Sequence, residues 1–371
     1  MRVIMTGGGT GGHIYPALAI ARGIMDRWPR AKIIFVGTRE GMEKDIVPES
    51  GFEFRTISAK GLNRSSLVKA ASSALKVPIG FWQARNIIKE FNPDVVVGTG
   101  GYVSYPVVLA AGIMQFKTVI HEQNALPGLA NRALGKRADR IMLTFPEAAA
   151  YFPEDKTTVT GLPVRPEILT ATRREAASFF ALKEDRFTLV VFGGSRGAQR
   201  INRAVEGLVE QLSANGIQLI WITGEQHYAT IQESIVSRGN IDNVRIYPYL
   251  FNMELALAMA DLAVCRAGAA TLSELAVRGV PAILVPYPYA AENHQEKNAR
   301  YLEKKGAALV IIDEFLDQQT LAAKINELLN NKFRLLRMGQ IMKNEGRPRA
   351  LEDILDIIEE VVESKKEIDS P

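Results

Sequence analysis

Short runs of β-branched and apolar residues alternate with longer helical patterns along the whole chain, and this alternation constrains the fold most strongly. In the first half, the predicted strands are Val3–Thr6, Lys32–Gly37, Glu53–Ile57, Asp94–Gly98, Thr118–His121 and Arg140–Leu143. In the second half, they are Phe187–Gly193, Gln218–Thr223, Val244–Tyr247, Leu262–Cys265, Ala282–Pro286 and Ala308–Ile311. Such alternation is typical of βαβ units, whose strands run parallel. The sequence therefore predicts an α/β fold with doubly wound parallel sheets.

The length of 371 residues favours two domains, because a domain usually takes about 100–200 residues. Two prolines in Gly161-Leu162-Pro163-Val164-Arg165-Pro166 interrupt the periodicity. We therefore expect a Rossmann-like domain over residues 1–163, a second Rossmann-like domain over residues 164–345, and a C-terminal helix and tail over residues 346–371. The helical pattern of Leu351–Val362 is apolar on one face and needs a surface to pack on, for which the first domain is one candidate.

Cysteine and histidine usage excludes a fold held together by disulfides and a fold held together by structural zinc. The single cysteine, Cys265, cannot form an internal disulfide, and the four histidines show no zinc-site spacing. This usage is typical of a reduced, cytoplasmic compartment. The 22 uncharged residues between Asp94 and Lys117 would suffice for a span of about 20 residues, but glycines, a serine and a proline break them into strand, turn and helix. The apolar run at the N-terminus is shorter than the roughly 7–15 residues of a signal-peptide core.

The formal net charge of +4 is unevenly distributed along the chain. Residues 1–165 carry a net charge of +8 and residues 166–371 a net charge of −4. A basic first half would suit nucleic acid, anionic lipid or a phosphorylated substrate. Because no RNA-reading or DNA-reading motif is present, we do not expect nucleic acid as a partner.

A glycine-rich loop, Gly7-Gly8-Gly9-Thr10-Gly11-Gly12-His13, follows the first predicted strand and opens the first helix. Glycines allow the backbone to approach a ligand, and the free amides of a helix start attract an anion. The loop fits a dinucleotide pattern only weakly, because the second strand lacks the terminal acid that binds ribose, and Glu40 lies beyond it. No Gly-Lys-Ser/Thr follows, so the loop is not that of a nucleotide triphosphatase.

Three more glycine turns follow predicted strands: Gly98-Thr99-Gly100-Gly101-Tyr102, Gly193-Gly194-Ser195-Arg196-Gly197 and Arg266-Ala267-Gly268-Ala269-Ala270-Thr271. Each alone is explained by a tight turn between strand and helix. Four of them, shared by both predicted domains, favour a ligand whose phosphates are contacted from both sides. Such a ligand is expected in the crevice beyond the carboxyl ends of the strands.

Several polar side chains near these turns have a structural and a functional interpretation. His13 suits a general base or a contact to hydroxyl or phosphate, or else a capping or packing role. His121 fits a satisfied histidine at a strand end, which makes Asn124 the better candidate for a ligand contact. Glu274 lies three residues after a threonine, a spacing that a capping box also explains. The amides of Asn293–Asn298 suit sugar hydroxyls, or simply a polar helix start.

In register along the chain, these motifs closely resemble the MurG family of peptidoglycan glycosyltransferases, which has the GT-B fold and belongs to glycosyltransferase family 28. The resemblance extends from Gly7 to about Ala307. Its motifs are Gly8-Gly9-Thr10-Gly11-Gly12-His13, Gly100-Gly101-Tyr102-Val103-Ser104, His121-Glu122-Gln123-Asn124, Pro163-Val164-Arg165, Gly193-Gly194-Ser195 and Thr271-Leu272-Ser273-Glu274. It implies transfer of N-acetylglucosamine from UDP-N-acetylglucosamine to undecaprenyl-diphospho-N-acetylmuramoyl-pentapeptide, which converts lipid I to lipid II.

The resemblance also implies roles for individual residues, with the first domain taking the acceptor and the second the donor. From the first domain, the expected donor contacts are Thr10, Gly11, Gly12 and Asn124. From the second, they are Arg165, Ser195, Leu250, Ala269, Ala270, Thr271, Glu274, Gln295 and Asn298. Three departures from the commonest pattern leave details of donor binding open: Gly161-Leu162-Pro163 replaces Gly-Asn-Pro, and Arg196 and His294 stand where glutamine is frequent.

The implied mechanism is an inverting displacement, in which the acceptor C4 hydroxyl attacks the anomeric carbon. We expect His13 to take the hydroxyl proton, because imidazole titrates near neutral pH. The chain contains no Asp-x-Asp, so we expect neither an obligatory metal nor a cofactor. A different lipid acceptor for a GT-B enzyme, and a catalytically silent nucleotide-sugar-binding protein, are the alternatives.

A lipid-linked acceptor implies contact with an anionic membrane surface without a membrane span. The residues expected to make that contact are Lys69, Leu75, Lys76, Ile79, Phe81 and Trp82. An ordinary core helix is the alternative interpretation of this segment. The resemblance places the protein on the cytoplasmic face of the bacterial cell membrane, as a peripheral protein with other cell-wall synthesis proteins as candidate partners.

Overall fold

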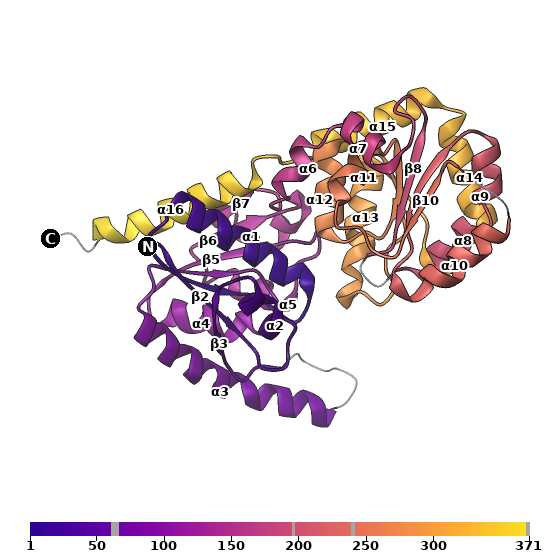
Figure 1. Ribbon diagram of the computed structural model, residues 1–371. Helices are drawn as coiled ribbons and strands as arrows, with labels where there is room; N and C mark the ends of the chain where they lie inside the picture. Colours follow the sequence, from indigo (N-terminus) through magenta and orange to yellow (C-terminus); the bar gives the residue numbers. More distant parts are fainter. Residues whose placement is uncertain (61–66, 195–196, 239–241, 369–371) are drawn as a thin grey trace. The chain divides into compact units, whose positions relative to one another are not determined.

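The computed structural model describes residues 1–60, 67–194, 197–238 and 242–368, with side chains described outside residues 67–77 and 365–368. The chain divides into two compact units. Unit 1 comprises Met1–Pro163 together with Arg349–Pro371, and unit 2 comprises Val164–Pro348. Each unit is built on one parallel sheet (Figure 1).

Unit 1 contains a seven-stranded sheet with the order β3-β2-β1-β4-β5-β6-β7, and every neighbouring pair is parallel. Its strands are β1 (Arg2–Thr6), β2 (Lys32–Gly37), β3 (Glu53–Thr56), β4 (Val95–Gly98), β5 (Lys117–Glu122), β6 (Arg140–Leu143) and β7 (Thr157–Val159). The six strands predicted in this half are confirmed, with ends that differ by at most one residue. Strand β7 was not predicted, because three residues are too few to show a periodicity.

The helices of unit 1 include one from the far end of the chain. They are α1 (Gly11–Arg27), α2 (Glu43–Glu49), α3 (Leu67–Phe91), α4 (Ser104–Ile113), α5 (Leu129–Leu134), the 3₁₀ turns η1 (Pro146–Tyr151) and η2 (Glu154–Lys156), and α16 (Ala350–Ile368). Figure 1 shows α16 lying along α1, and its residues Ile354 and Ile358 are fully buried in the same core cluster as Ile14 and Ile24. The apolar face of the last helix therefore packs on the first domain.

Unit 2 contains a six-stranded parallel sheet with the order β10-β9-β8-β11-β12-β13. Its strands are β8 (Thr188–Phe192), β9 (Gln218–Ile222), β10 (Val244–Tyr247), β11 (Leu262–Cys265), β12 (Ala282–Leu284) and β13 (Ala308–Val310). All six were predicted. Its helices are α6 (Pro166–Thr170), α7 (Arg173–Phe180), α8 (Gln199–Glu206), α9 (Val209–Ala214), α10 (Glu225–Ser237), α11 (Met253–Met259), α12 (Ala269–Arg278), α13 (His294–Lys305), α14 (Gln318–Leu329) and α15 (Lys332–Asn344), with the 3₁₀ turns η3 (Ala291–Asn293) and η4 (Asp313–Phe315).

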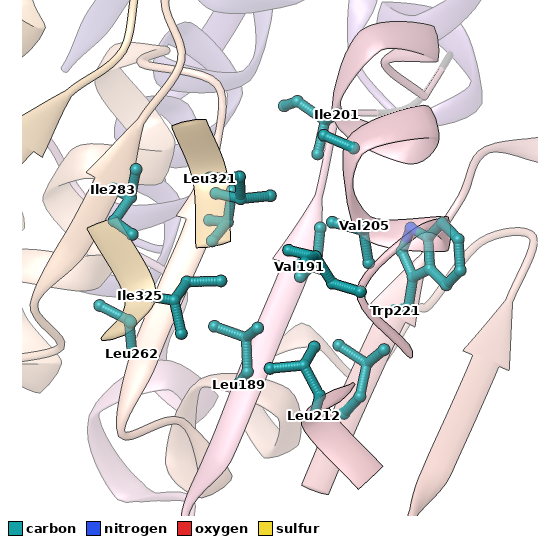
Figure 2. Packing of buried hydrophobic residues seen from close by; sticks show 14 of the residues in the cluster. Leu189, Val191, Ile201, Val205, Leu212, Trp221, Leu262, Ile283, Leu321 and Ile325 are labelled. Atoms are coloured by element: carbon teal, nitrogen blue, oxygen red, sulfur yellow. The ribbon is translucent and has the colours of Figure 1, made fainter. Parts of the chain in front are cut away.

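The core of unit 2 forms where helices cover the central strand β8. Figure 2 shows Val191 of β8 among Val205 of α8, Ile325 of α14 and Trp221 of β9. Trp221 is fully buried and donates its indole N–H to Asn202 Oδ1 over 3.0 Å, so its one polar atom is satisfied. Burying a large apolar side chain contributes about 1.5–3 kcal/mol, and this core holds the carboxyl ends of the strands in place.

The strand orders place the glycine turns in pairs. In unit 1 the order reverses between β1 and β4, which precede the first and second glycine turns. In unit 2 it reverses between β8 and β11, which precede the third and fourth. Ligands of open α/β sheets bind beyond the carboxyl ends of the strands at such switch points. All four glycine turns therefore lie where a ligand site is expected in each unit.

None of the helices in the described ranges combines the length and apolar character that a membrane crossing requires. The uncharged run between Asp94 and Lys117 forms β4, a turn and α4, as predicted.

Candidate active site

The two glycine turns of unit 1 interlock at the β1/β4 switch point. Thr99 N donates to Thr6 O over 2.9 Å, and Gly8 N donates to Gly100 O over 3.4 Å. Gly101 has a φ of +82°, and a Cβ atom there would lie 2.2 Å from Gly8 O. Only glycine fits this approach, so the close packing of the two turns explains part of their glycine content.

A buried carboxylate that the sequence did not indicate supports the first glycine turn. Glu43, 1% exposed at the start of α2, accepts hydrogen bonds from Gly9 N over 3.0 Å, Thr38 N over 3.0 Å and Thr38 Oγ1 over 2.8 Å. Glu43, the acid that follows β2 at the start of α2, therefore binds backbone amides of the protein in this structure. Its position shortly after the end of β2 at Gly37 is the one feature of the sequence that could have indicated such a role.

The start of α1 offers backbone amides to an anion. The N-cap residue Thr10 makes no side-chain cap bond, and the first turn carries no acidic residue. His13 N and Ile14 N donate to Thr10 O over 3.1 and 3.2 Å, whereas the amides of Gly11 and Gly12 come before the first intrahelical bonds. Thr10 and Gly12 are exposed. This helix start therefore has the features of an anion-binding N-terminus.

His13 is half-buried and is held through one ring nitrogen. Its Nδ1 lies 3.0 Å from Thr99 O and 3.1 Å from Gln123 Oε1, and Thr99 Oγ1 donates to the His13 carbonyl over 2.8 Å. Within the described residues, its Nε2 forms no hydrogen bond. The ring is thus held through Nδ1.

Strand β5 ends in a buried polar group that shapes the following loop. His121 is fully buried and donates from Nε2 to Gly161 O over 2.9 Å, as expected for a satisfied strand-end histidine. Burial lowers the pKa of His121 from 6.5 to about 4, partly opposed by that hydrogen bond. Glu122, 1% exposed, accepts from Asn124 N over 2.9 Å and from Gly128 N over 3.1 Å. It therefore fixes the loop that carries the half-buried Asn124.

In unit 2, Arg165 and Glu274 meet near the β8/β11 switch point. Arg165 Nε lies 3.4 Å from Glu274 Oε1, and Arg165 Nη1 donates to Phe251 O over 3.4 Å. Burial raises the pKa of Glu274, and Arg165 opposes that rise. A capping box would place a threonine at the N-cap, but α12 begins at Ala269 after the N-cap Gly268. The capping-box explanation of Glu274 is therefore wrong.

Three more of the residues expected at the donor form the start of α12. The amides of Ala269, Ala270 and Thr271 form the first turn of α12, and Leu272 N makes the first intrahelical bond, to Gly268 O. Leu250 is 6% exposed and lies in the segment between β10 and α11. Ser195, together with Arg196, lies outside the described residues.

The two amide residues of α13 hold the β11 turn in place. Gln295 Oε1 accepts from Ala267 N over 3.2 Å and from Tyr287 N over 3.0 Å. Asn298 is fully buried and donates to Ala267 O over 3.3 Å. Both side chains therefore position the turn that leads into α12, and their contact with a sugar stays a prediction.

The segment expected at the membrane is only partly described. Ile79 and Trp82 of α3 are 53% and 58% exposed. Phe81 is half-buried against the core cluster of unit 1, so it is less available than the sequence suggested. The side chains of Lys69, Leu75 and Lys76 lie outside the described set. Among the residues whose side chains are described, no group of three or more His, Cys, Asp or Glu side chains is placed to hold a metal ion.

Two family domains match the sequence. Residues 3–143 match the glycosyltransferase family 28 N-terminal domain, and residues 188–354 match the glycosyltransferase family 28 C-terminal domain. A Desulforamulus reducens protein named UDP-N-acetylglucosamine--N-acetylmuramyl-(pentapeptide) pyrophosphoryl-undecaprenol N-acetylglucosamine transferase is 48% identical over 368 residues, which cover 98% of this chain and 99% of the relative. A relative of the same name from Moorella thermoacetica is 45% identical, with 98% and 100% covered.

A solved structure agrees with these relatives. The crystal structure of Acinetobacter baumannii MurG superposes with a TM-score of 0.80 at 27% identity, covering 97% of this chain and 99% of that chain. The predicted GT-B architecture of two parallel-sheet α/β domains is thereby confirmed. Matches of both family domains and identity over nearly the whole chain lead to one conclusion: this protein is a member of glycosyltransferase family 28.

Proposed function

We propose that this protein transfers N-acetylglucosamine from UDP-N-acetylglucosamine to the C4 hydroxyl of undecaprenyl-diphospho-N-acetylmuramoyl-pentapeptide, forming lipid II. The observation that carries the proposal is the 48% identity, over 98% of the chain, to a relative named for this reaction. The paired glycine turns at the switch points of both units support it, because both substrates carry a diphosphate.

Unit 2 takes the donor. The first-turn amides of α12, at Ala269, Ala270 and Thr271, face the UDP diphosphate, and Arg165 adds a positive charge beside them. Helix N-termini and guanidinium groups stabilise the charge that develops on departing UDP. Glu274 accepts hydrogen bonds from the ribose hydroxyls, Leu250 offers its backbone to uracil, and Ser195 contacts the diphosphate. The side-chain amides of Gln295 and Asn298 form hydrogen bonds with the N-acetylglucosamine.

Unit 1 takes the acceptor and supplies the base. Thr10, Gly11, Gly12 and Asn124 approach the donor from this unit. The acceptor C4 oxygen forms a bond to the anomeric carbon as the bond from that carbon to the UDP oxygen breaks, and UDP leaves with the electron pair. The hydroxyl proton passes to His13 Nε2, which is available because Nδ1 makes the bonds that hold the ring.

An assay with UDP-N-acetylglucosamine and a lipid I analogue tests this proposal. We expect stoichiometric UDP and lipid II, activity retained in excess EDTA, and a fall in kcat of about two decades or more for His13→Ala, the size of a general-base contribution. His227→Ala, a histidine of α10, is the matched control and should keep kcat.

Three outcomes would contradict it. UDP release with diacylglycerol but not with the lipid I analogue would indicate a different acceptor, and binding without turnover would indicate a silent sugar-nucleotide protein. An effect of His13→Ala confined to KM would assign His13 to substrate positioning.

The acceptor is a membrane lipid, so the protein works as a peripheral protein at the cytoplasmic face of the membrane, where UDP-sugars are available. Ile79 and Trp82, both more than half exposed on α3, support contact with the lipid surface. Arg85 lies over the Trp82 ring, with its guanidinium carbon 5.3 Å from the centroid, and adds positive charge near an anionic surface. Other cell-wall synthesis proteins are candidate partners.

A further inference from the structure

A chain of hydrogen bonds joins the candidate base to the buried end of β5, and the proposed function does not use it. The chain comprises His121, Gln123 and His13. Gln123 is 1% exposed and lies between the two rings, with its Nε2 3.1 Å from His121 Nδ1 and its Oε1 3.1 Å from His13 Nδ1. The two histidines are separated by 108 residues in the sequence and come together only in the fold.

Backbone carbonyls determine the direction of every bond in this chain, because a carbonyl oxygen only accepts. Gly161 O, 2.9 Å from His121 Nε2, requires a proton on that nitrogen. Since burial keeps His121 neutral, its Nδ1 then carries a lone pair. His121 O lies 3.0 Å from Gln123 Nε2, so the amide nitrogen faces His121 and the amide oxygen faces His13.

The same reasoning fixes the proton on His13. Its Nδ1 lies between two acceptors, Thr99 O at 3.0 Å and Gln123 Oε1 at 3.1 Å, and must therefore carry a proton. In the neutral ring, the lone pair is then on Nε2, the nitrogen that can accept a proton. The hydrogen bond made by one ring nitrogen sets the role of the other.

We propose that Gln123 is a positioning residue that, with His121 behind it, holds His13 in the Nδ1–H tautomer and directs the Nε2 lone pair toward the acceptor hydroxyl. This inference rests on the proposed role of His13 as the base. After proton transfer, the same two acceptors stabilise the imidazolium through charge-assisted bonds from Nδ1. An amide oxygen cannot take up the proton, so the positive charge stays on His13.

Long-range ¹H–¹⁵N NMR of histidine-labelled protein tests this directly, at about pH 8, where an unperturbed imidazole is neutral. The chain contains only four histidines, so substitution assigns each signal. In the wild type, we expect His13 to show a protonated Nδ1 and a lone pair on Nε2. A proton on Nε2 of His13 in the wild type would overturn the inference.

Gln123→Met, which keeps the side-chain length but removes both polar atoms, provides the second test. We expect the Nδ1–H population of His13 to fall and kcat to fall about tenfold, with the KM for UDP-N-acetylglucosamine within about twofold, since a misplaced base slows only the chemical step. Gln218→Met is the matched control. Gln218 is also 1% exposed and bonds to Lys183 and Thr188 in unit 2, so its loss should leave the tautomer and kcat unchanged.

The readouts separate the two proposals. An unchanged tautomer in Gln123→Met overturns the positioning role. A shifted tautomer with unchanged kcat supports positioning by Gln123 but contradicts the assignment of His13 as the base.

Discussion

At the residue scale, the buried Glu43 at the start of α2 shapes the first glycine turn of unit 1. Glu43 accepts a hydrogen bond from Gly9 N, whereas the amides of Gly11 and Gly12 come before the first intrahelical bonds of α1. Side chains at Gly8 and Gly41 would also collide with Glu43, since a Cβ atom at either would lie within 2.6 Å of its carboxylate. Glu43 and the glycines around it are therefore closely packed against one another.

The neutral state of buried His121 makes stability depend on pH. His121 takes up a proton near pH 6.5 in the unfolded chain, whereas in the folded chain it does so only near pH 4. The folded pKa is therefore depressed. The stability that neutral His121 contributes is fully present above pH 6.5 and falls as the pH drops below that value, with a loss of up to about 3 kcal/mol by pH 4.

Urea unfolding at pH values between 4 and 6.5 measures the loss of stability. Amide hydrogen exchange in β5, measured over the same pH range, assigns that loss to unit 1. In His121→Gln, this contribution is absent, so the variant should lose less stability on acidification than the wild type. Parallel pH profiles for the two proteins would refute the prediction.

At the scale of elements, the proposed function uses two helix starts and one exposed helix face. Both α1 and α12 begin without an acidic residue in the first turn, which suits a phosphate at each. Helix α3 differs, because it exposes the large apolar side chains of Ile79 and Trp82. Its inner face carries Ala84 and Ile88, which lie in the core.

Flotation with anionic vesicles tests the proposed role of α3. The variant Ile79→Ser/Trp82→Ser should lose about two-thirds or more of vesicle binding, because two inserted apolar side chains are removed from the interface. Both residues are exposed, so the fold should persist. The matched control Phe333→Ser/Leu336→Ser alters two residues on α15 that are 77% and 74% exposed, and should bind as the wild type does. Equal binding by all three proteins would exclude this face as the membrane contact.

At the scale of the whole molecule, the chain returns to unit 1 after completing unit 2. Ile354, Ile358 and Val361 of α16 are buried, and Arg27 Nη1 of α1 lies 2.5 Å from Asp356 Oδ1. Gly23 of α1 allows the close approach of Leu351, whose Cδ1 would lie 2.8 Å from an added Cβ atom. The stability of unit 1 therefore depends on residues from both ends of the chain.

Paired core substitutions test whether each unit depends on its own core. Ile358→Ala should destabilise unit 1 by about 2–5 kcal/mol through the cavity it leaves, and Ile325→Ala should do the same in unit 2. Hydrogen exchange should accelerate in β1 and α1 for the first variant and in β8 and α14 for the second. Acceleration in the strands of both units for either variant would contradict this independence.

The sequence alone determined every described strand except β7, the parallel α/β class and the family, because these depend on patterns within short segments. Val244–Tyr247 and Leu262–Cys265 have the predicted ends, since short strand-forming runs bounded by polar or turn residues are local signals. Only the tertiary structure brought Glu43 to Gly9 and Gln123 to His13, which lie 34 and 110 residues apart. It also showed that Glu274 pairs with Arg165 across 109 residues, where a local capping box had been an alternative. Such contacts depend on how the strands are ordered in a sheet, and no single segment encodes that order.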